Sequence, residues 1–201
     1  MAIDSYMYFQ MYDSKFLESE SQVDLKPSPA DSKEIIDPFS KAFAQKGKAG
    51  CGLFEVEDYS FDVEQVLNIG SQSSGAGAGK ITFNPFSITR KIDCSSPDFF
   101  SKACSGTPFM SVGLGMRKSA GGGATGVMFL AFTFKLVAVK TVSWAHDDES
   151  PKETVTFEYG GLAIQYCQQK PDGTLMPQIA KAWNRVKNIA ADDMKANFDI
   201  K

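Results

Sequence analysis

Apolar and polar side chains alternate along much of the chain, and this period of two predicts β-strands. The alternating segments are residues 54–70, 80–93, 108–118 and 154–169. Residues 3–12 are apolar on both parities, so we expect that strand to be buried on both faces or to contact a neighbouring subunit. Residues 127–144 share this property, which predicts a central or bent strand. The chain thus contains about seven or eight strands without the βαβ rhythm of parallel sheets.

Three interruptions of the alternation predict bends. The parity changes around residues 57–58, which indicates a bulge. Pro85 has no N–H group to donate, so it belongs at a sheet edge or a kink. The pair Gly160–Gly161 divides a segment that is either two strands or one bulged strand.

One segment carries a clear helix signal. Ser96 is suited to cap a helix of about two turns, Pro97 to occupy its first turn and Gly106 to end it. Its apolar stripe consists of Phe99, Phe100, Ala103 and Cys104. A helix this short needs a sheet to pack against.

The segment of residues 18–52 is polar and differs from its surroundings, so we expect it to be an insertion. A second short helix is predicted inside it, with Asp37 as cap, Pro38 in the first turn and Gly47 at the end.

The C-terminal part is ambiguous. Apolar residues between Ile179 and Ala190 have helical spacing, but a strand through Trp183 is nearly as compatible with the sequence. The whole pattern predicts a mainly β fold, either a barrel or a sandwich, with a short flanking α-helix.

Composition narrows the class of protein. The 201 residues are 43% apolar, which suits one domain with a real core. The net charge is −3 with mixed signs along the chain, which is unlike a nucleic-acid-binding protein. The longest apolar stretch, residues 126–139, is shorter than the roughly 20 residues of a membrane helix, and the N-terminus lacks the pattern of a signal peptide. We therefore expect a protein made in the cytoplasm that neither binds nucleic acid nor inserts into a membrane.

A glycine-rich run is the first candidate for chemistry. It consists of Gly75, Ala76, Gly77, Ala78 and Gly79. A phosphate-binding loop needs the spacing G-x-x-x-x-G-K-[ST] and a helix after it. Here Ser74 stands in place of the first glycine, Ile81 replaces the hydroxyl residue, and a strand follows. We interpret the run as a long loop that joins two antiparallel strands and can contact another subunit.

Other reactive side chains form no recognisable site. His146–Glu149 offers four potential ligands, but adjacent loop residues rarely converge on one ion. The four cysteines are far apart, which predicts buried free thiols, and a Cys–His dyad would lack a nucleophile elbow. We expect no catalytic residue, no metal and no cofactor. Apolar strand faces and glycine-rich loops favour self-assembly instead, with a well-packed monomeric barrel as the alternative.

The order of these segments resembles the Hcp family, the haemolysin-coregulated tube protein of bacterial type VI secretion systems. The most specific parts are the block at residues 79–106, the R-K-x-A-G-G motif that begins at Arg117, and the strand segment that begins at Glu149. The likeness covers about residues 1–17 and 53–190. It implies one domain over residues 1–201, with an insertion at 18–52 and an extension at 191–201.

The resemblance implies a β-barrel of two antiparallel sheets, with a strand through Trp183. It also implies a hexameric ring built by head-to-tail contacts, and stacked rings that form a tube. In such a system the tube is surrounded by a contractile sheath, carries a spike and baseplate, and is secreted on contraction without a signal peptide. Effector proteins would travel in its lumen, and the Gly75–Gly79 loop would reach the adjacent ring. The alternatives are a ligand- or nucleotide-binding barrel and a phage-like tail-tube protein.

Overall fold

The structure, a computed structural model, describes residues 3–65, 81–118, 126–146, 150–172, 174–191, 198 and 200. Its elements in chain order are β1 (Ile3–Gln10), α1 (Lys33–Ala44), β2 (Phe54–Glu55), β3 (Asp58–Ser60), β4 (Val63–Gln65), β5 (Ile81–Phe83), β6 (Phe86–Lys91), α2 (Ser96–Ser105), β7 (Phe109–Lys118), β8 (Val127–His146), β9 (Pro151–Tyr166), β10 (Ile179–Asn184) and β11 (Ile189–Ala190). The described chain is thus mainly β, as the alternation predicts.

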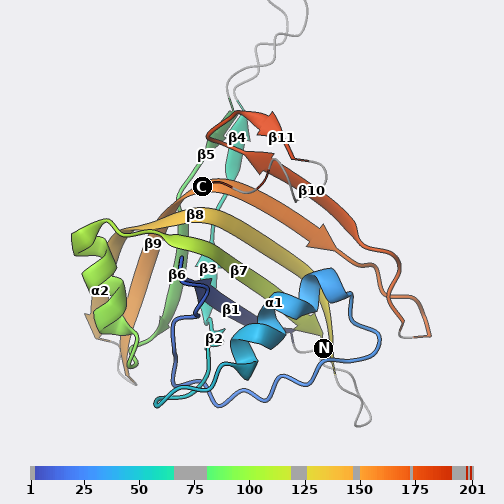
Figure 1. Cartoon of the computed structure of the whole chain (residues 1–201), viewed down its shortest axis with the longest axis horizontal. Helices are drawn as coiled ribbons and strands as arrows, with labels where there is room; N and C mark the ends of the chain where they lie inside the picture. Colours follow the sequence, from blue (N-terminus) through green and yellow to red (C-terminus); the bar gives the residue numbers. More distant parts are fainter. Residues whose placement is uncertain are drawn as a thin grey trace, which may run out of the picture.

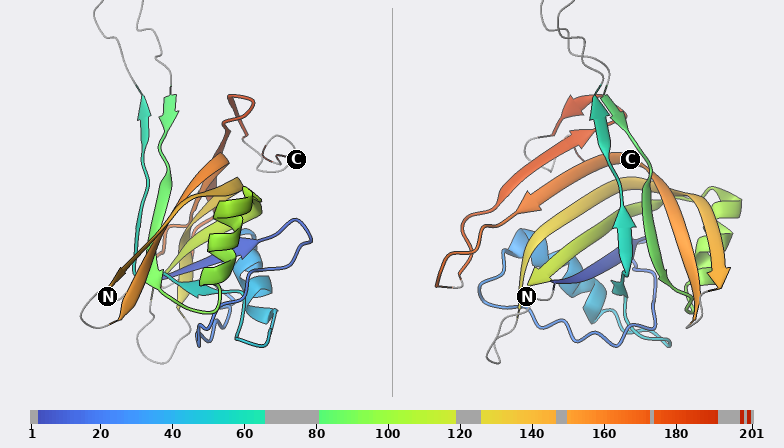
Figure 2. Two further views of the ribbon diagram at one scale, coloured as in Figure 1. Left: turned by 90° about the vertical axis from the view of Figure 1, so that its left-hand side faces the viewer. Right: turned by 180° about the vertical axis from the view of Figure 1, so that it is seen from behind.

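Antiparallel pairing joins most strands into a strongly bent sheet. Its order is β11-β10-β9-β8-β7-β1-β2, and β6 pairs with both β3 and β9. The long strands β8 and β9 pair from Leu130↔Tyr166 to His146↔Pro151, so each takes part in both layers of the barrel (Figures 1 and 2). This arrangement confirms the predicted β-barrel of antiparallel sheets with a flanking helix.

The bends lie at or near the predicted interruptions. β5 and β6 are separated at Pro85, and β2 pairs with β1 whereas β3 pairs with β6, which accounts for the parity change between them. The expected bulge at Gly160–Gly161 is wrong, because β9 is one strand and its register with β8 shifts between Val139 and Thr141. Gly160 instead leaves room for Leu136, which has a φ of 49°.

Phenylalanine fills the interior of the barrel. Phe9 of β1 lies in the middle of the cluster, with ring centroids 5.1 Å from Phe54, 5.0 Å from Phe99, 5.2 Å from Phe109 and 5.5 Å from Phe157. All five side chains are fully buried. Tilted and edge-to-face contacts of this kind add to the stabilisation from buried area.

A second hydrophobic core lies between α1 and the outer face of the sheet. β1 contributes to both cores, because Met7 and Phe9 face the barrel interior while Tyr6 and Tyr8 pack with α1 residues such as Phe39. Burial raises the pKa of Tyr8 to about 12. The double-sided strand is therefore buried on both faces within one chain, which was the first of the two predicted alternatives.

The small residues of β7 make room for this second core. A Cβ atom on Gly115 would lie 2.7 Å from Cζ of Phe39, and one on Gly113 would lie 2.2 Å from Cε1 of Tyr8. Aromatic rings, rather than the backbone of another chain, occupy the space above the glycines. Part of the apolar surface that favoured self-assembly is thus covered by the chain's own residues 33–44.

α1 begins earlier than the sequence predicted. It spans Lys33–Ala44 with Ser32 at its N-cap, so Asp37 is not the cap and Pro38 lies inside the helix. The buried side chains are Ile35, Ile36, Phe39 and Ala42. Packing of the two isoleucines extends the helix one turn ahead of the proline.

α2 and the C-terminal strands agree better with expectation. α2 spans Ser96–Ser105, with Pro97 in its first turn and Gly106, whose φ is 68°, at its C-cap. The predicted cap is wrong by one residue, because Ser95 is at the N-cap and Ser96 is the first helical residue. The helical interpretation of residues 179–190 is wrong, because β10 passes through Trp183 and pairs with Leu162 of β9.

Candidate assembly surfaces

The predicted contact loop, Gly75–Gly79, lies outside the described residues. The strands on either side of it are described, and β4 pairs antiparallel with β5 through Val63↔Phe83 and Gln65↔Ile81. This hairpin projects from the body of the barrel in Figure 2. A strand rather than a helix therefore follows Lys80, so the geometry required of a phosphate-binding loop is missing.

The other candidate chemistry is dispersed. His146 ends β8, and residues 147–149 lie outside the described part of the chain. Among the residues that the structure describes, no group of three or more His, Cys, Asp or Glu side chains could hold a metal ion. Cys51 and Cys167 are buried free thiols as predicted, whereas Cys94 and Cys104 are exposed. No helix in the described ranges is long and apolar enough to cross a membrane.

A buried charged cluster, which the sequence did not predict, links the start of α2 to the barrel through ion pairs and a hydrogen bond. Glu153 of β9 is fully buried, and its Oε1 atom lies 2.9 Å from Nε of Arg90 on β6. Nη2 of Arg90 also contacts Asp93, just before α2. The hydroxyl of Ser96 donates to Oε1 of Glu153 at 2.9 Å. Three separate elements are thereby held in one position.

Asp93 is the partly exposed member of this cluster. Its burial acts to raise its pKa, but hydrogen bonds from Ser95 and the charge of Arg90 outweigh that effect, so the pKa of Asp93 is lowered. Ser95 donates from its backbone N–H at 2.8 Å and from its hydroxyl at 2.6 Å. The backbone N–H of Glu20 also donates to Asp93, which ties residues 18–22 to the same place.

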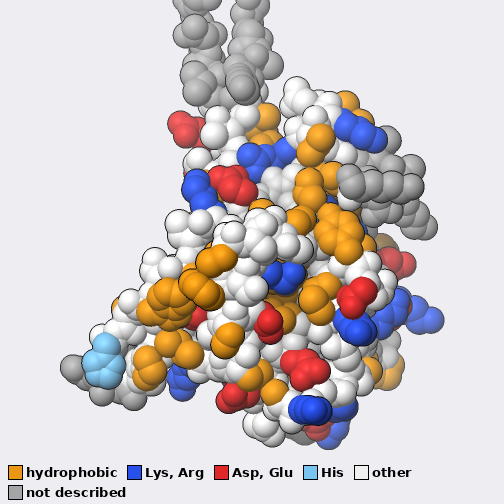
Figure 3. Space-filling model, turned by 60° about the vertical axis from the view of Figure 1, so that its left-hand side comes forward, with side chains coloured by type: hydrophobic (Ala, Val, Ile, Leu, Met, Phe, Trp, Pro, Cys, Tyr) orange, Lys and Arg blue, Asp and Glu red, His pale blue; other side chains and the backbone are white. Residues whose placement is uncertain are grey.

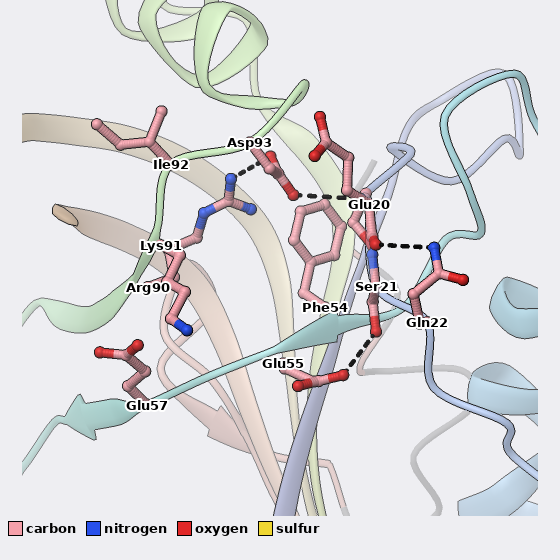
Figure 4. Close-up of a pocket in the computed structure, with 11 residues that line it drawn as sticks. Glu20, Ser21, Gln22, Phe54, Glu55, Glu57, Arg90, Lys91, Ile92 and Asp93 are labelled. Carbon is pink, nitrogen blue, oxygen red and sulfur yellow. Dashed lines mark hydrogen bonds and ion pairs between the residues drawn. The ribbon is translucent and has the colours of Figure 1, made fainter. Parts of the chain in front are cut away.

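An open cleft of about 490 Å³ lies beside the cluster (Figure 4). Buried Phe54 and Arg90 form part of its lining, and the hydroxyl of Ser21 donates to Glu55 at 3.0 Å. The other charged groups are Glu20, Glu57, Asp93 and Lys91, so the cleft has four carboxylates against two basic groups. Its lining residues include no His or Cys. The cleft is therefore an acidic feature of the described surface.

Next to this cleft is an apolar surface that we call the α2 patch, formed by Ile92, Phe100 and Trp144. These side chains are 39%, 53% and 52% exposed, and the rings of Phe100 and Trp144 lie 6.2 Å apart. Figure 3 shows hydrophobic side chains gathered on this side of the molecule. The sequence placed Phe100 in the buried stripe of the helix, but only Phe99 of that stripe is fully buried.

A second apolar surface continues the barrel core across β8, β9 and β10. We call it the β9–β10 stripe, and its members are Leu130, Phe132, Ile164, Tyr166 and Ile179. Register places Leu130, Tyr166 and Ile179 in one row across the three strands, and Phe132 and Ile164 in the next row. Exposure rises outward from half-buried Leu130 and Phe132 to 42% for Ile164, 40% for Tyr166 and 66% for Ile179. The core is thus open on this side of the described barrel.

Exposed apolar surfaces on a curved β-barrel are typical of the class of proteins that bind other protein subunits. Comparison with known proteins identifies the family. Residues 46–166 match the sequence profile described as "Type VI secretion system effector, Hcp". The chain is also 32% identical over 115 residues to the protein hcp1 of Pseudomonas aeruginosa, a match that covers 56% of this chain and 70% of the relative.

Solved structures show the same fold. One is a type six secretion system protein with a TM-score of 0.71 and 21% identity, covering 94% of this chain and all of the other. Another is Hcp1 from Salmonella typhimurium, with a TM-score of 0.62 and 22% identity, covering 95% of this chain and all of the other. The chain belongs to the Hcp family of type VI secretion system tube proteins, as the sequence resemblance predicted.

Membership of this family gives the chain its general role. It is a structural subunit of the inner tube, a secreted component of the type VI system that assembles with copies of itself. Sequence analysis did not predict the α2 patch or the β9–β10 stripe. An apolar face gives the same sequence pattern whether the rest of the chain covers it or leaves it exposed.

Proposed function

We propose that six copies of this chain close into a ring by head-to-tail contacts and that rings stack into the tube. The observation that supports this most directly is the β9–β10 stripe, where the barrel core continues onto surface that the described residues leave uncovered. A contact between two different surfaces of one protein closes into a ring when its rotation permits. Burial of large apolar side chains contributes roughly 1.5–3 kcal/mol each, which favours such a contact.

We also propose how the tube takes part in secretion. The tube would be assembled in the cytoplasm, enclosed by the contractile sheath and attached to spike and baseplate proteins, and expelled when the sheath contracts. Effector proteins would be carried in the ring lumen. The role is mechanical, so we expect no turnover of a substrate by any side chain of this protein.

The segment at residues 18–52 is proposed to be an insertion into a single domain rather than a domain of its own. Its helix α1 shares the second core with β1 and β8, including Tyr8 and Met128. The N–H of Met128 also donates to Asp31 at 2.8 Å. A segment held in this way stiffens the outer face of the sheet. The residues at 191–201 are proposed to be a C-terminal extension of the same domain.

Native mass spectrometry of the purified protein tests the ring. The expected spectrum shows hexamers and multiples of six, and negative-stain images show annular particles. A protein that stays monomeric at high concentration, or that hydrolyses a nucleotide, would contradict the proposal.

A further inference from the structure

We propose that the α2 patch of one copy docks on the β9–β10 stripe of the next copy, and that these two surfaces form the interface of the ring. This inference rests on the proposed ring and specifies which parts of the chain meet in it. Three observations support the pairing: the positions of the two surfaces, their charges and their exposure.

The two surfaces lie at opposite ends of the β8–β9 pair. Trp144 is opposite Glu153 at one end, and Leu130 is opposite Tyr166 at the other. The 14 residue steps from Leu130 to Trp144 correspond to about 45 Å measured along the strand. A two-fold dimer would pair each surface with the unlike surface of its partner and leave neither free. When each contact uses one pair of surfaces, one of each stays free, and the assembly grows until it closes into a ring if the rotation permits. The hexamers expected in the mass spectrum distinguish the ring from a dimer.

Charge distinguishes the two surfaces. Ile92 belongs both to the α2 patch and to the lining of the acidic cleft, where carboxylates outnumber basic groups by two. The stripe has basic neighbours instead, because Lys181 is directly opposite Ile164 and Nζ of Lys118 lies 4.5 Å from the ring centre of Phe129, which contacts Tyr166. Opposite charges around the two surfaces favour contact of the α2 patch with the β9–β10 stripe over contact of either surface with its own copy.

Cross-linking tests the pairing directly. The background variant is Cys94→Ser with Cys104→Ser, which removes the exposed thiols and keeps buried Cys51 and Cys167. Ser101→Cys, beside Phe100, and Gln168→Cys, two residues beyond Tyr166, are introduced into separate proteins at exposed positions. We expect a flexible bismaleimide to give covalent dimers in the mixture and none with either protein alone.

A third thiol controls for random collision. Lys48→Cys is also exposed but lies on neither surface, so we expect no dimer when it is mixed with Ser101→Cys. A second chain carrying both Ser101→Cys and Gln168→Cys is expected to give a covalent ladder that ends at the closed ring.

Charged substitutions provide an independent measurement. Phe100→Lys and Ile179→Lys change side chains that are 53% and 66% exposed, so each monomer should fold while its rings are lost from the mass spectrum. Val186→Lys is the matched control, because Val186 is 65% exposed and lies between β10 and β11, outside both surfaces. A mixture of the two defective proteins retains one intact pair of surfaces and is expected to stop at heterodimers.

The outcomes separate this inference from the proposed ring. If the wild-type protein forms hexamers but the Ser101–Gln168 cross-link is absent, or if both lysine variants still form rings, the pairing is wrong and the ring proposal stands. If the wild-type protein forms no ring, both proposals fail.

Discussion

At the scale of single residues, the buried charged cluster is the main departure from a hydrocarbon core. Arg90 and Glu153 are 2% and 0% exposed, and each compensates the charge of the other. Removing one partner from a buried pair leaves an uncompensated charge, which costs about 3–5 kcal/mol. We expect Arg90→Ala to lower the free energy of unfolding by this amount in a denaturant titration.

An exposed ion pair gives the matched comparison. Lys140 lies 3.1 Å from Glu158, with side chains 50% and 42% exposed. Exposed pairs contribute only about 0–1 kcal/mol, so Lys140→Ala is expected to have a small effect at the same protein concentration. Equal losses for the two variants would show that burial of the Arg90 cluster has no energetic consequence.

Asp93 gives the cluster a pH dependence. Its pKa is lowered in the folded protein, so its ionised form contributes stability above the unfolded pKa of about 4, and this contribution is lost as the pH falls through the folded pKa. We expect the unfolding free energy of the wild-type protein to fall more steeply below about pH 4 than that of Asp93→Asn. Parallel curves for the two proteins in denaturant titrations from pH 7 to pH 3 would refute this prediction.

At the scale of elements, α1 and β7 are fitted to each other. A methyl group at Gly115 would collide with the ring of Phe39 and with Sδ of Met128, 2.8 Å away. Overpacking of this kind costs roughly 1–3 kcal/mol, so Gly115→Ala is expected to destabilise the protein by that amount. In a Phe39→Leu background the cost should shrink, and a double-mutant cycle of unfolding free energies measures the difference.

Gly106 supplies the control for this cycle. No atom lies within 4 Å of a Cβ built there, and its φ is 68°, so Gly106→Ala destabilises only through the backbone. Its cost should be the same in the wild-type and the Phe39→Leu backgrounds. If Gly115→Ala also costs the same in both backgrounds, α1 is not packed on β7 as described.

Local signals explain which elements were predictable. The end of α2 was predicted because Gly106 acts through its own backbone angle, and the break before β6 because Pro85 lacks an N–H group. The start of α1 and the strand through Trp183 depend on distant partners. Helical spacing was present around Trp183, but pairing with Leu162 decides its conformation.

The candidate surfaces were less predictable than the fold. The sequence predicted strands with apolar side chains on both faces. It did not indicate which of these faces other parts of the same chain would cover. Tyr8 and Gly113 turned out to be covered by one another and by α1, whereas Tyr166 stayed 40% exposed. The charged cluster could not be predicted either, because Arg90 and Glu153 are far apart in the sequence. Pairing of β6 with β9 brings them into contact.

At the scale of the whole molecule, the two apolar surfaces and the β4–β5 hairpin lie on different parts of the protein. The α2 patch and the β9–β10 stripe lie at the two ends of β8 and β9, whereas the hairpin projects away from the barrel body (Figure 2). We propose that the two apolar surfaces form contacts within a ring and that the hairpin forms contacts between rings. Changes to the hairpin should then affect stacking without affecting ring closure.

The glycine-rich run between β4 and β5 provides the test of this separation. We expect replacement of Gly77 and Gly79 by leucine to leave hexamers intact and to reduce the fraction of stacked rings, because bulky residues restrict the backbone where glycine permits many conformations. Native mass spectrometry measures ring closure, and electron microscopy measures tube length in the same preparation. Replacement of Ala76 and Ala78 by serine is the matched control, since it changes the same loop with little added bulk and is expected to preserve stacking. Tubes of unchanged length in the leucine variant would show that the run does not contribute to contacts between rings, and loss of hexamers would place it in the ring interface instead.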